Sequence, residues 1–483
     1  MHGPMEESIY TKSVTTLVKY IQSQTPTKDS LFEQAEVYFE SSAKDKETRF
    51  ALQEDVDTIK AALLTTDGKR NTILQKRLDI AERTYKKELA RQQEQRSLRY
   101  QKASEVCRKL LELTEGENWQ VTQTNSAKLL GTLQLLSPGE GVKLVQQRQR
   151  LKPAYKGVIA TRLLDKLLLD EHITNRYINQ HHQLDERYPQ KEGELTPFQL
   201  NVAIPVLIAA LFQDVGLLHP KAQLLLKGED GCLDEFRVMD KDTRLTLLKI
   251  NHEQTLDYIT YGLGKAAYVG RSKQEKLEFE HNENERLNFT RMLIKDALKP
   301  KLGLGNLLKV PQIYTSVIFS TKQSYSFLDL PKAGLIVAKA AEGGVISTVA
   351  ANSLLAIVGH FPQGYGITYI PKDDDGQDRD SYEYAIVNEL NPDDPHIPKC
   401  RIATRNLTFI SNGKSMLINT ENNLFFRSTR KKLEKVNPAR LEEILRKLVS
   451  NFEERKELDL IPSYWNPYGF FCYRKLQNIW KKI

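Results

Sequence analysis

Histidine and cysteine are the first side chains in this sequence whose positions suggest metal chemistry. His181 and His182 are adjacent, and His172 lies nine residues before His181. Imidazole nitrogens bind divalent metals, so these histidines are one candidate site. The alternative, which we favour, is a polar helix face, because no other candidate metal ligands are grouped with these histidines in the sequence.

The cysteines form no Cys-x-x-Cys pair, so they predict neither a zinc knuckle nor a disulfide framework. The absence of a disulfide framework favours a reducing compartment. The four cysteines are Cys107, Cys232, Cys400 and Cys472.

Other patterns of catalytic residues are weak. Gly262-Leu263-Gly264 lacks a third glycine at the dinucleotide-binding spacing and follows no strand, so it predicts a turn. Gly303-Leu304-Gly305 is interpreted as a loop in the same way. No serine or cysteine lies in the context of a nucleophile. The sequence therefore gives no support to these enzyme classes.

A more informative series of short motifs runs from residue 209 to residue 325. An apolar helix ends in a polar pair, a hydrophobic residue and a glycine, Gln213-Asp214-Val215-Gly216-Leu217, and Pro220 and a leucine-rich turn follow it. The later members of the series are Lys249-Ile250-Asn251-His252, His281-Asn282-Glu283, Leu307-Leu308-Lys309-Val310-Pro311-Gln312 and Ser324-Tyr325.

In this order, the motifs resemble those of the HD-GYP domain, a bacterial branch of the HD superfamily of metal-dependent phosphohydrolases. The turn Gly359-His360-Phe361-Pro362 and the later Asn391-Pro392 resemble the end of many such domains. The resemblance covers residues 160–410 or so. It implies an all-helical core and a place in cyclic di-GMP signalling.

The resemblance also implies that most of the metal site is missing. In the family, metal ions hold a water that attacks phosphorus. At the family's ligand positions this chain keeps Asp214, His252 and His281 as a remnant metal site. At the substituted positions, Gln213 and Asn282 stand where the family has histidines. Gln312 stands in place of an aspartate, and Leu217 in place of a lysine. Neutral amides are poor ligands, so we expect no catalytic residues and no cofactor, with a single Fe or Mn ion as the alternative.

Each remnant also has a purely structural interpretation. Asp214 fits a helix-end residue, and His252 fits a core histidine that bonds to the backbone. His281 lies in the charged stretch 278–286, where it would be exposed. The family's glycine-rich loop is replaced by residues 284–289, which argues against its substrate-binding surface.

The net charge of +8 comes from one segment. Residues 69–109 carry thirteen basic and five acidic residues. They could contact an acidic partner, or they could form the solvated face of a packing helix, which we favour. Nucleic acid is not expected, because no aromatic or glycine pattern accompanies the charge.

The fold class predicted is mainly α. A long helix over Asn71–Leu113 carries a narrow apolar stripe, as in a helical hairpin or coiled coil that could form a homodimer. Extended segments are expected around Trp119–Thr122. Short strands are expected at Ile367–Ile370, Tyr382–Val387, Arg401–Arg405, Leu407–Ile410, Ser415–Ile418 and Leu424–Phe426.

Five segments are predicted along the chain. They are an N-terminal helical module (1–115), a connecting segment (116–152), the degenerate HD-GYP-like domain (153–360), a small β segment (361–430) and a C-terminal helix with an aromatic tail (431–483). No signal peptide or transmembrane segment is expected, because the apolar stretches 203–212 and 334–358 are short or interrupted by charge. We therefore expect a cytoplasmic protein.

Three functions remain open. The first is a non-catalytic HD-GYP-like signalling or scaffold protein, linked to cyclic di-GMP and acting through protein partners. The second is a divergent phosphodiesterase with an incomplete metal site. The third is an adaptor that binds an acidic partner through the basic helix 69–109. Arg401 and Arg405 match half of the arginine motif of PilZ domains, which bind cyclic di-GMP, but the partner motif does not follow.

Overall fold

The structure is a computed structural model that describes most of the 483 residues. The described ranges are 5–65, 67–137, 144–182, 187–189, 193–300, 303–322, 325–449, 452–456 and 459–480. Ser324 of the predicted Ser324-Tyr325 motif lies outside them. The chain divides into two compact units, each made of separated segments. The first unit comprises residues 1–19, 107–211 and 296–483, and the second comprises residues 20–106 and 212–295.

The first unit is built around a helical body. Helix α5 is its centre, because nearly every residue from Leu151 to Leu168 is buried and the helix packs against α4, α11 and α13. The helices of the body are α4 (Trp119–Leu135), α5 (Leu144–Leu169), α7 (Ile204–Phe212), α11 (Asn306–Ile318), α12 (Lys332–Glu342) and α13 (Thr348–Val358). The other helices of this unit are α1 (Ile9–Ile21), α6 (Arg176–His181), η2 (Gln199–Ala203), η5 (Phe327–Asp329), α14 (Arg427–Leu433), α15 (Pro438–Leu448), α16 (Phe452–Lys456), α17 (Tyr468–Phe471) and η6 (Arg474–Leu476).

Helix α4 begins where extended segments were expected, so that prediction is wrong. Asn118 has an extended backbone, and its side chain accepts a hydrogen bond from the amide of Val121 at 3.0 Å. This cap satisfies one of the amides that a helix start leaves without a partner, which stabilises helix from Trp119 onward.

Short strands follow the helical body, as predicted, and they pair as a small antiparallel sheet. Its strand order is β1-β2-β3-β6, and β4 and β5 form a separate pair. The strands are β1 (Gly366–Tyr369), β2 (Glu383–Val387), β3 (Lys399–Ile402), β4 (Thr404–Arg405), β5 (Thr408–Phe409) and β6 (Ser415–Leu417). The strand predicted at Leu424–Phe426 is wrong. The amide of Leu424 bonds to the carbonyl of Thr368 in β1 at 2.9 Å. The amide of Phe425 bonds instead to the side chain of Asn423 at 3.0 Å, so the chain turns after this single bridge and forms no strand.

The aromatic C-terminal segment docks onto the sheet. The Trp465 ring stacks on Tyr384 with the ring centres 4.6 Å apart, and its Nε1 donates to the carbonyl of Ala385 at 3.0 Å. The segment also meets the start of the chain, since Gln477 Oε1 accepts from the hydroxyl of Thr11 at 2.8 Å. Helix α1 and the segment around Gln477 are thus joined within the first unit.

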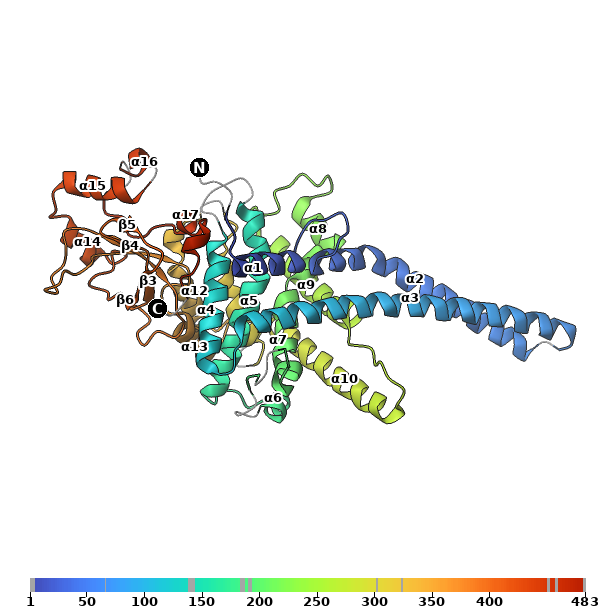
Figure 1. Ribbon diagram of the computed structural model, residues 1–483. Helices are drawn as coiled ribbons and strands as arrows, with labels where there is room; N and C mark the ends of the chain where they lie inside the picture. Colours follow the sequence, from blue (N-terminus) through green and yellow to red (C-terminus); the bar gives the residue numbers. More distant parts are fainter. Residues whose placement is uncertain are drawn as a thin grey trace. The chain divides into compact units, whose positions relative to one another are not determined.

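The second unit contains a long antiparallel helical hairpin (Figure 1). Its helices are α2 (Leu31–Leu64), α3 (Lys69–Thr114), η3 (Val215–Leu218), α8 (Pro220–Lys227), α9 (Lys241–Asp257), η4 (Tyr258–Leu263) and α10 (Lys273–Asp296). The predicted long helix is confirmed as α3. Its stripe residues Leu78 and Ala81 pack with Val56 and Ile59 of α2, which makes the apolar seam of the hairpin.

One stretch of the described residues, Gln199–Leu218, is long and apolar enough to cross a bilayer. Most of its residues are buried inside the structure, as in the core helix of a soluble protein. A single stretch of this kind is weak support for a membrane span.

Candidate functional site

The turn after α7, where the HD-GYP-like motif begins, packs closely against helix α9. A Cβ added at Gly216 would lie 2.2 Å from the carbonyl oxygen of Asn251, so only glycine allows this approach of η3 to α9. The glycine of the motif therefore has a packing role in this chain.

Polar groups of the same turn bond to α9. The Thr255 hydroxyl donates to the carbonyl of Gln213 at 3.3 Å and accepts from the amide of Gly216 at 3.0 Å. The Asn251 amide group is 3.5 Å from the same Gln213 carbonyl, at the limit of a hydrogen bond. The turn is thus held by hydrogen bonds between its backbone and the side chains of Thr255 and Asn251. Gln213 itself is 8% exposed, and its Oε1 has no hydrogen-bond partner among the described residues.

The three remnant residues lie on different elements of the second unit. Asp214 precedes η3 and is half-buried, His252 lies half-buried on α9, and His281 is exposed on α10. Burial lowers the pKa of His252, and Lys295 lowers it further, while Glu253 opposes the shift. His252 is therefore a neutral imidazole at pH 7. Within the described ranges, no group of three or more His, Cys, Asp or Glu side chains could hold a metal ion.

The substituted positions are also spread out. Leu217 is half-buried on η3, and Asn282 is exposed on α10 beside His281. Gln312 is half-buried on α11, which belongs to the first unit. Gln312 thus lies in a different compact unit from Gln213, Leu217 and Asn282.

The histidines near residue 180 pack against aromatic rings. His181 meets Tyr177 edge-on with ring centres 5.0 Å apart, and His182 meets Phe198 at 5.5 Å. His172 is exposed. This arrangement supports the non-metal interpretation of these three residues.

A buried cluster of charges in the first unit is the feature that sequence reasoning missed. Glu115 accepts hydrogen bonds from Arg162 at 2.6 Å, from Arg187 at 2.8 Å and from Gln199 at 2.7 Å. Asp165 pairs with Arg187 at 2.7 Å and with Arg162 at 3.1 Å. All four charged side chains are nearly inaccessible, and the two acids balance the two bases.

This cluster is a fixed ionic network. Burial alone would raise the pKa of Glu115, but Arg187 and Arg162 outweigh burial and lower it to about 2. A carboxylate that stays ionised at neutral pH cannot act as a general acid there. The cluster links Arg162 and Asp165 of α5 to Glu115, Arg187 and Gln199. No local sequence pattern predicts this charge cluster, because Arg187 lies 72 residues from Glu115 along the chain.

Two arginines of the basic helix have internal partners in the second unit. Arg96 donates to the carbonyl of Thr260 at 3.1 Å, and Arg99 donates to that of Gly262 at 2.7 Å. Both carbonyls lie in the π-helix η4. The guanidinium groups of Arg96 and Arg99 therefore cap the carboxyl-terminal end of η4 and place positive charge there. The ring of Tyr258 in η4 packs in a cluster of aromatic rings: Tyr38, Phe39 and Phe212. Part of the basic segment therefore holds the fold together.

Comparison of the chain with protein-family models, with curated proteins and with solved structures finds no match. The functional argument therefore rests on the residues and geometry described above.

Proposed function

We propose that this protein is a non-catalytic HD-GYP-like signalling or scaffold protein, linked to cyclic di-GMP signalling. The observation that carries the proposal is the internal network at the turn after α7. Thr255 and Asn251 bond to the backbone of Gln213 and Gly216 where the family begins its metal site. A turn occupied by such a network can serve as a structural support without a metal.

The electrostatics of the second unit support the same proposal. A pair of metal ions needs anionic ligands to offset its charge. Gln213 and Asn282 contribute neutral amides, and the retained His281 is exposed on α10. Among the three remnant residues, Asp214 is the one that carries a carboxylate. The link to cyclic di-GMP rests on the order of the sequence motifs.

Metal analysis and a hydrolysis assay of the full chain test the absence of catalysis. After purification with Fe or Mn present throughout, we expect less than stoichiometric metal and no hydrolysis of cyclic di-GMP. Asp214→Ala should leave both readings unchanged. Stoichiometric metal that disappears in Asp214→Ala, together with hydrolysis, would establish the divergent phosphodiesterase instead.

Calorimetry with cyclic di-GMP tests the link to that nucleotide. We expect saturable binding without turnover. Absence of heat at high protein concentration would remove the nucleotide from the proposal and leave a scaffold role alone.

A second candidate function is an adaptor for an acidic partner. Its support is a row of exposed cations along α3 that form no ion pair with any described residue: Lys69, Arg70, Lys76, Arg77, Arg83, Lys86 and Lys87. Binding of an acidic protein through this row should weaken steeply with salt. Charge reversal at Lys86 and Lys87 should remove that dependence, whereas reversal at exposed Lys249 on α9 should not.

A further inference from the structure

Helix α3 has an exposed face on the side away from its seam with α2. Six residues at alternating spacings of four and three define this outer face, and all six are exposed: Lys69, Ile73, Lys76, Ile80, Arg83 and Lys87. Leu78, which packs in the seam, is two residues from both Lys76 and Ile80. Two residues correspond to about 200° around a helix, so the outer face lies opposite the seam.

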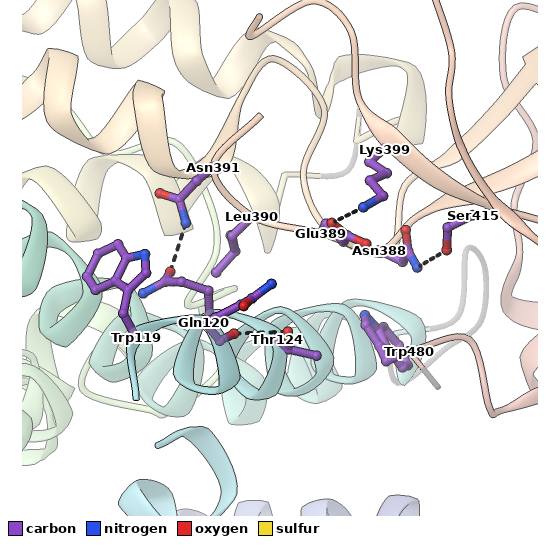
Figure 2. Close-up of a pocket in the computed structure, with 11 residues that line it drawn as sticks. Trp119, Gln120, Thr124, Asn388, Glu389, Leu390, Asn391, Lys399, Ser415 and Trp480 are labelled. Carbon is purple, nitrogen blue, oxygen red and sulfur yellow. Dashed lines mark hydrogen bonds and ion pairs between the residues drawn. The ribbon is translucent and has the colours of Figure 1, made fainter. Parts of the chain in front are cut away.

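The four cations of the outer face form no ion pair with any residue that the structure describes. Other exposed cations of the chain are paired. Lys399, at the rim of a cavity of about 240 Å³ in the first unit, pairs with Glu389 at 2.8 Å (Figure 2). Arg91, further along α3, pairs with Asp45 at 2.6 Å. Since none of its six positions is acidic, the outer face is complementary to an anionic partner.

Two large aliphatic side chains alternate with these cations. Ile73 and Ile80 are 62% and 63% exposed. Leu64, at the end of α2 that adjoins the turn of the hairpin, is 88% exposed. Removal of aliphatic surface from water is favourable, so a partner that covers the outer face gains most if it accepts hydrocarbon as well as positive charge.

An anionic lipid bilayer offers both components along the whole outer face. At a rise of about 1.5 Å per residue, this face is about 27 Å long from Lys69 to Lys87. Lipid phosphates lie above the acyl chains, so long basic side chains can reach the phosphates while shorter aliphatic ones insert between the headgroups. A fluid surface meets the alternation of charge and hydrocarbon without a fixed complementary pattern, which a folded protein partner would need.

We propose that the outer face of α3 binds the surface of an anionic lipid bilayer, with Ile73 and Ile80 inserted among the headgroups and the cations at the lipid phosphates. The helix would lie along the surface without crossing it. The inference rests on the adaptor role proposed above and names a lipid surface, in place of an acidic protein, as the partner. The net charge of +8 would attract the whole chain to such a surface.

Co-sedimentation of the full chain with lipid vesicles tests the proposal. Vesicles of phosphatidylcholine are compared with vesicles that also contain phosphatidylglycerol, and soluble polyglutamate serves as a polyanion without a hydrocarbon layer. We expect binding to the phosphatidylglycerol vesicles, little binding to phosphatidylcholine alone, and release at high salt. Lys76→Glu combined with Lys87→Glu should abolish binding both to the anionic vesicles and to polyglutamate.

A second variant separates the lipid surface from other anionic partners. Ile73→Gln combined with Ile80→Gln keeps every charge, and it should weaken vesicle binding about tenfold while polyglutamate binding is unchanged. The matched control is Leu245→Gln combined with Leu248→Gln on α9, where the side chains are 55% and 45% exposed. This control should leave both kinds of binding unchanged, and circular dichroism verifies that each variant is folded.

The proposal is overturned if the chain does not sediment with phosphatidylglycerol vesicles, or if the double isoleucine variant binds them as tightly as the wild type. Binding of polyglutamate without binding of vesicles would leave the adaptor for an acidic protein in place. Loss of both would remove the adaptor role as well.

Discussion

The two units of this chain use charge in opposite ways. The first unit buries Glu115, Asp165, Arg162 and Arg187 as one network. The second unit keeps most of its charges on the surface of the α2–α3 hairpin, as in the pair between Arg91 and Asp45, where the arginine side chain is 44% exposed. A buried ion pair that loses one partner strands the other charge, whereas an exposed pair loses little. The position of a charge therefore matters more than its number.

The largest expected effect is the removal of Glu115. Glu115→Ala strands Arg162 and Arg187 in the interior and should lower the free energy of unfolding by about 3–5 kcal/mol. All three tryptophans, Trp119, Trp465 and Trp480, lie in the first unit, so fluorescence during urea unfolding reports that unit. Glu88→Ala in the hairpin is the control and should leave this transition in place. A loss below about 1 kcal/mol would contradict the comparison.

Acid should erase much of the Glu115 contribution. The pKa of Glu115 is about 2 in the folded protein, and the ordinary pKa of a glutamate is 4.5. The ionised carboxylate of Glu115 therefore contributes its full stabilisation of the folded state above pH 4.5, and this contribution is lost as the pH falls towards 2. The gap corresponds to about 3 kcal/mol. The difference in unfolding free energy between wild type and Glu115→Gln should shrink over that window. A constant difference from pH 7 to pH 3 would mean that the carboxylate is not stabilised by its arginines.

In the second unit, backbone packing should matter more than charge. Gly216→Ala places a methyl group against the carbonyl of Asn251 and should cost about 1–3 kcal/mol. Far-UV circular dichroism should record this loss while the tryptophan transition stays unchanged. Gly343→Ala is the matched control, because its Cβ would meet no atom closer than 3.4 Å. Equal effects of the two substitutions would refute the packing role of Gly216.

The smallest expected effect is at the exposed pair of the hairpin. Arg91→Ala removes contacts to Asp45 at 2.6 Å and to Glu88, and should cost only about 0.2–1 kcal/mol. The cost should fall further in 1 M salt, because solvent ions screen such pairs. A salt-independent cost of several kcal/mol would remove the contrast between the two units.

Local patterns in the sequence were enough to predict several elements. The stripe through Leu78 and Ala81 predicted the long helix, because an apolar face at helical spacing must be buried. The stripe left a hairpin and a coiled coil open, and the structure shows the hairpin with α2. The alternation and turn residues of 366–417 predicted most of the small sheet. The local pattern predicted an extended segment at Trp119, where the N-cap Asn118 begins a helix. It also predicted a strand at Leu424, where a turn formed by the Asn423 side chain is found instead.

The candidate sites were predicted less well. The motif residues Asp214, His252 and His281 could be named from the sequence, but their distribution over three elements could not. The buried charge cluster could not be predicted from local patterns, because Glu115 and Arg187 lie 72 residues apart in the chain.

By itself, the sequence determined that the chain is mainly helical, that a segment of short strands follows, and that α3 carries the excess positive charge. These properties depend on neighbours within a few residues. Only the tertiary structure decided which polar groups are buried together, because that requires contacts between distant segments. Glu115 with Arg187, Gly216 with Asn251 and Asn388 with Ile479 are examples. Burial strengthens the effect of each contact, since water no longer competes for the polar groups.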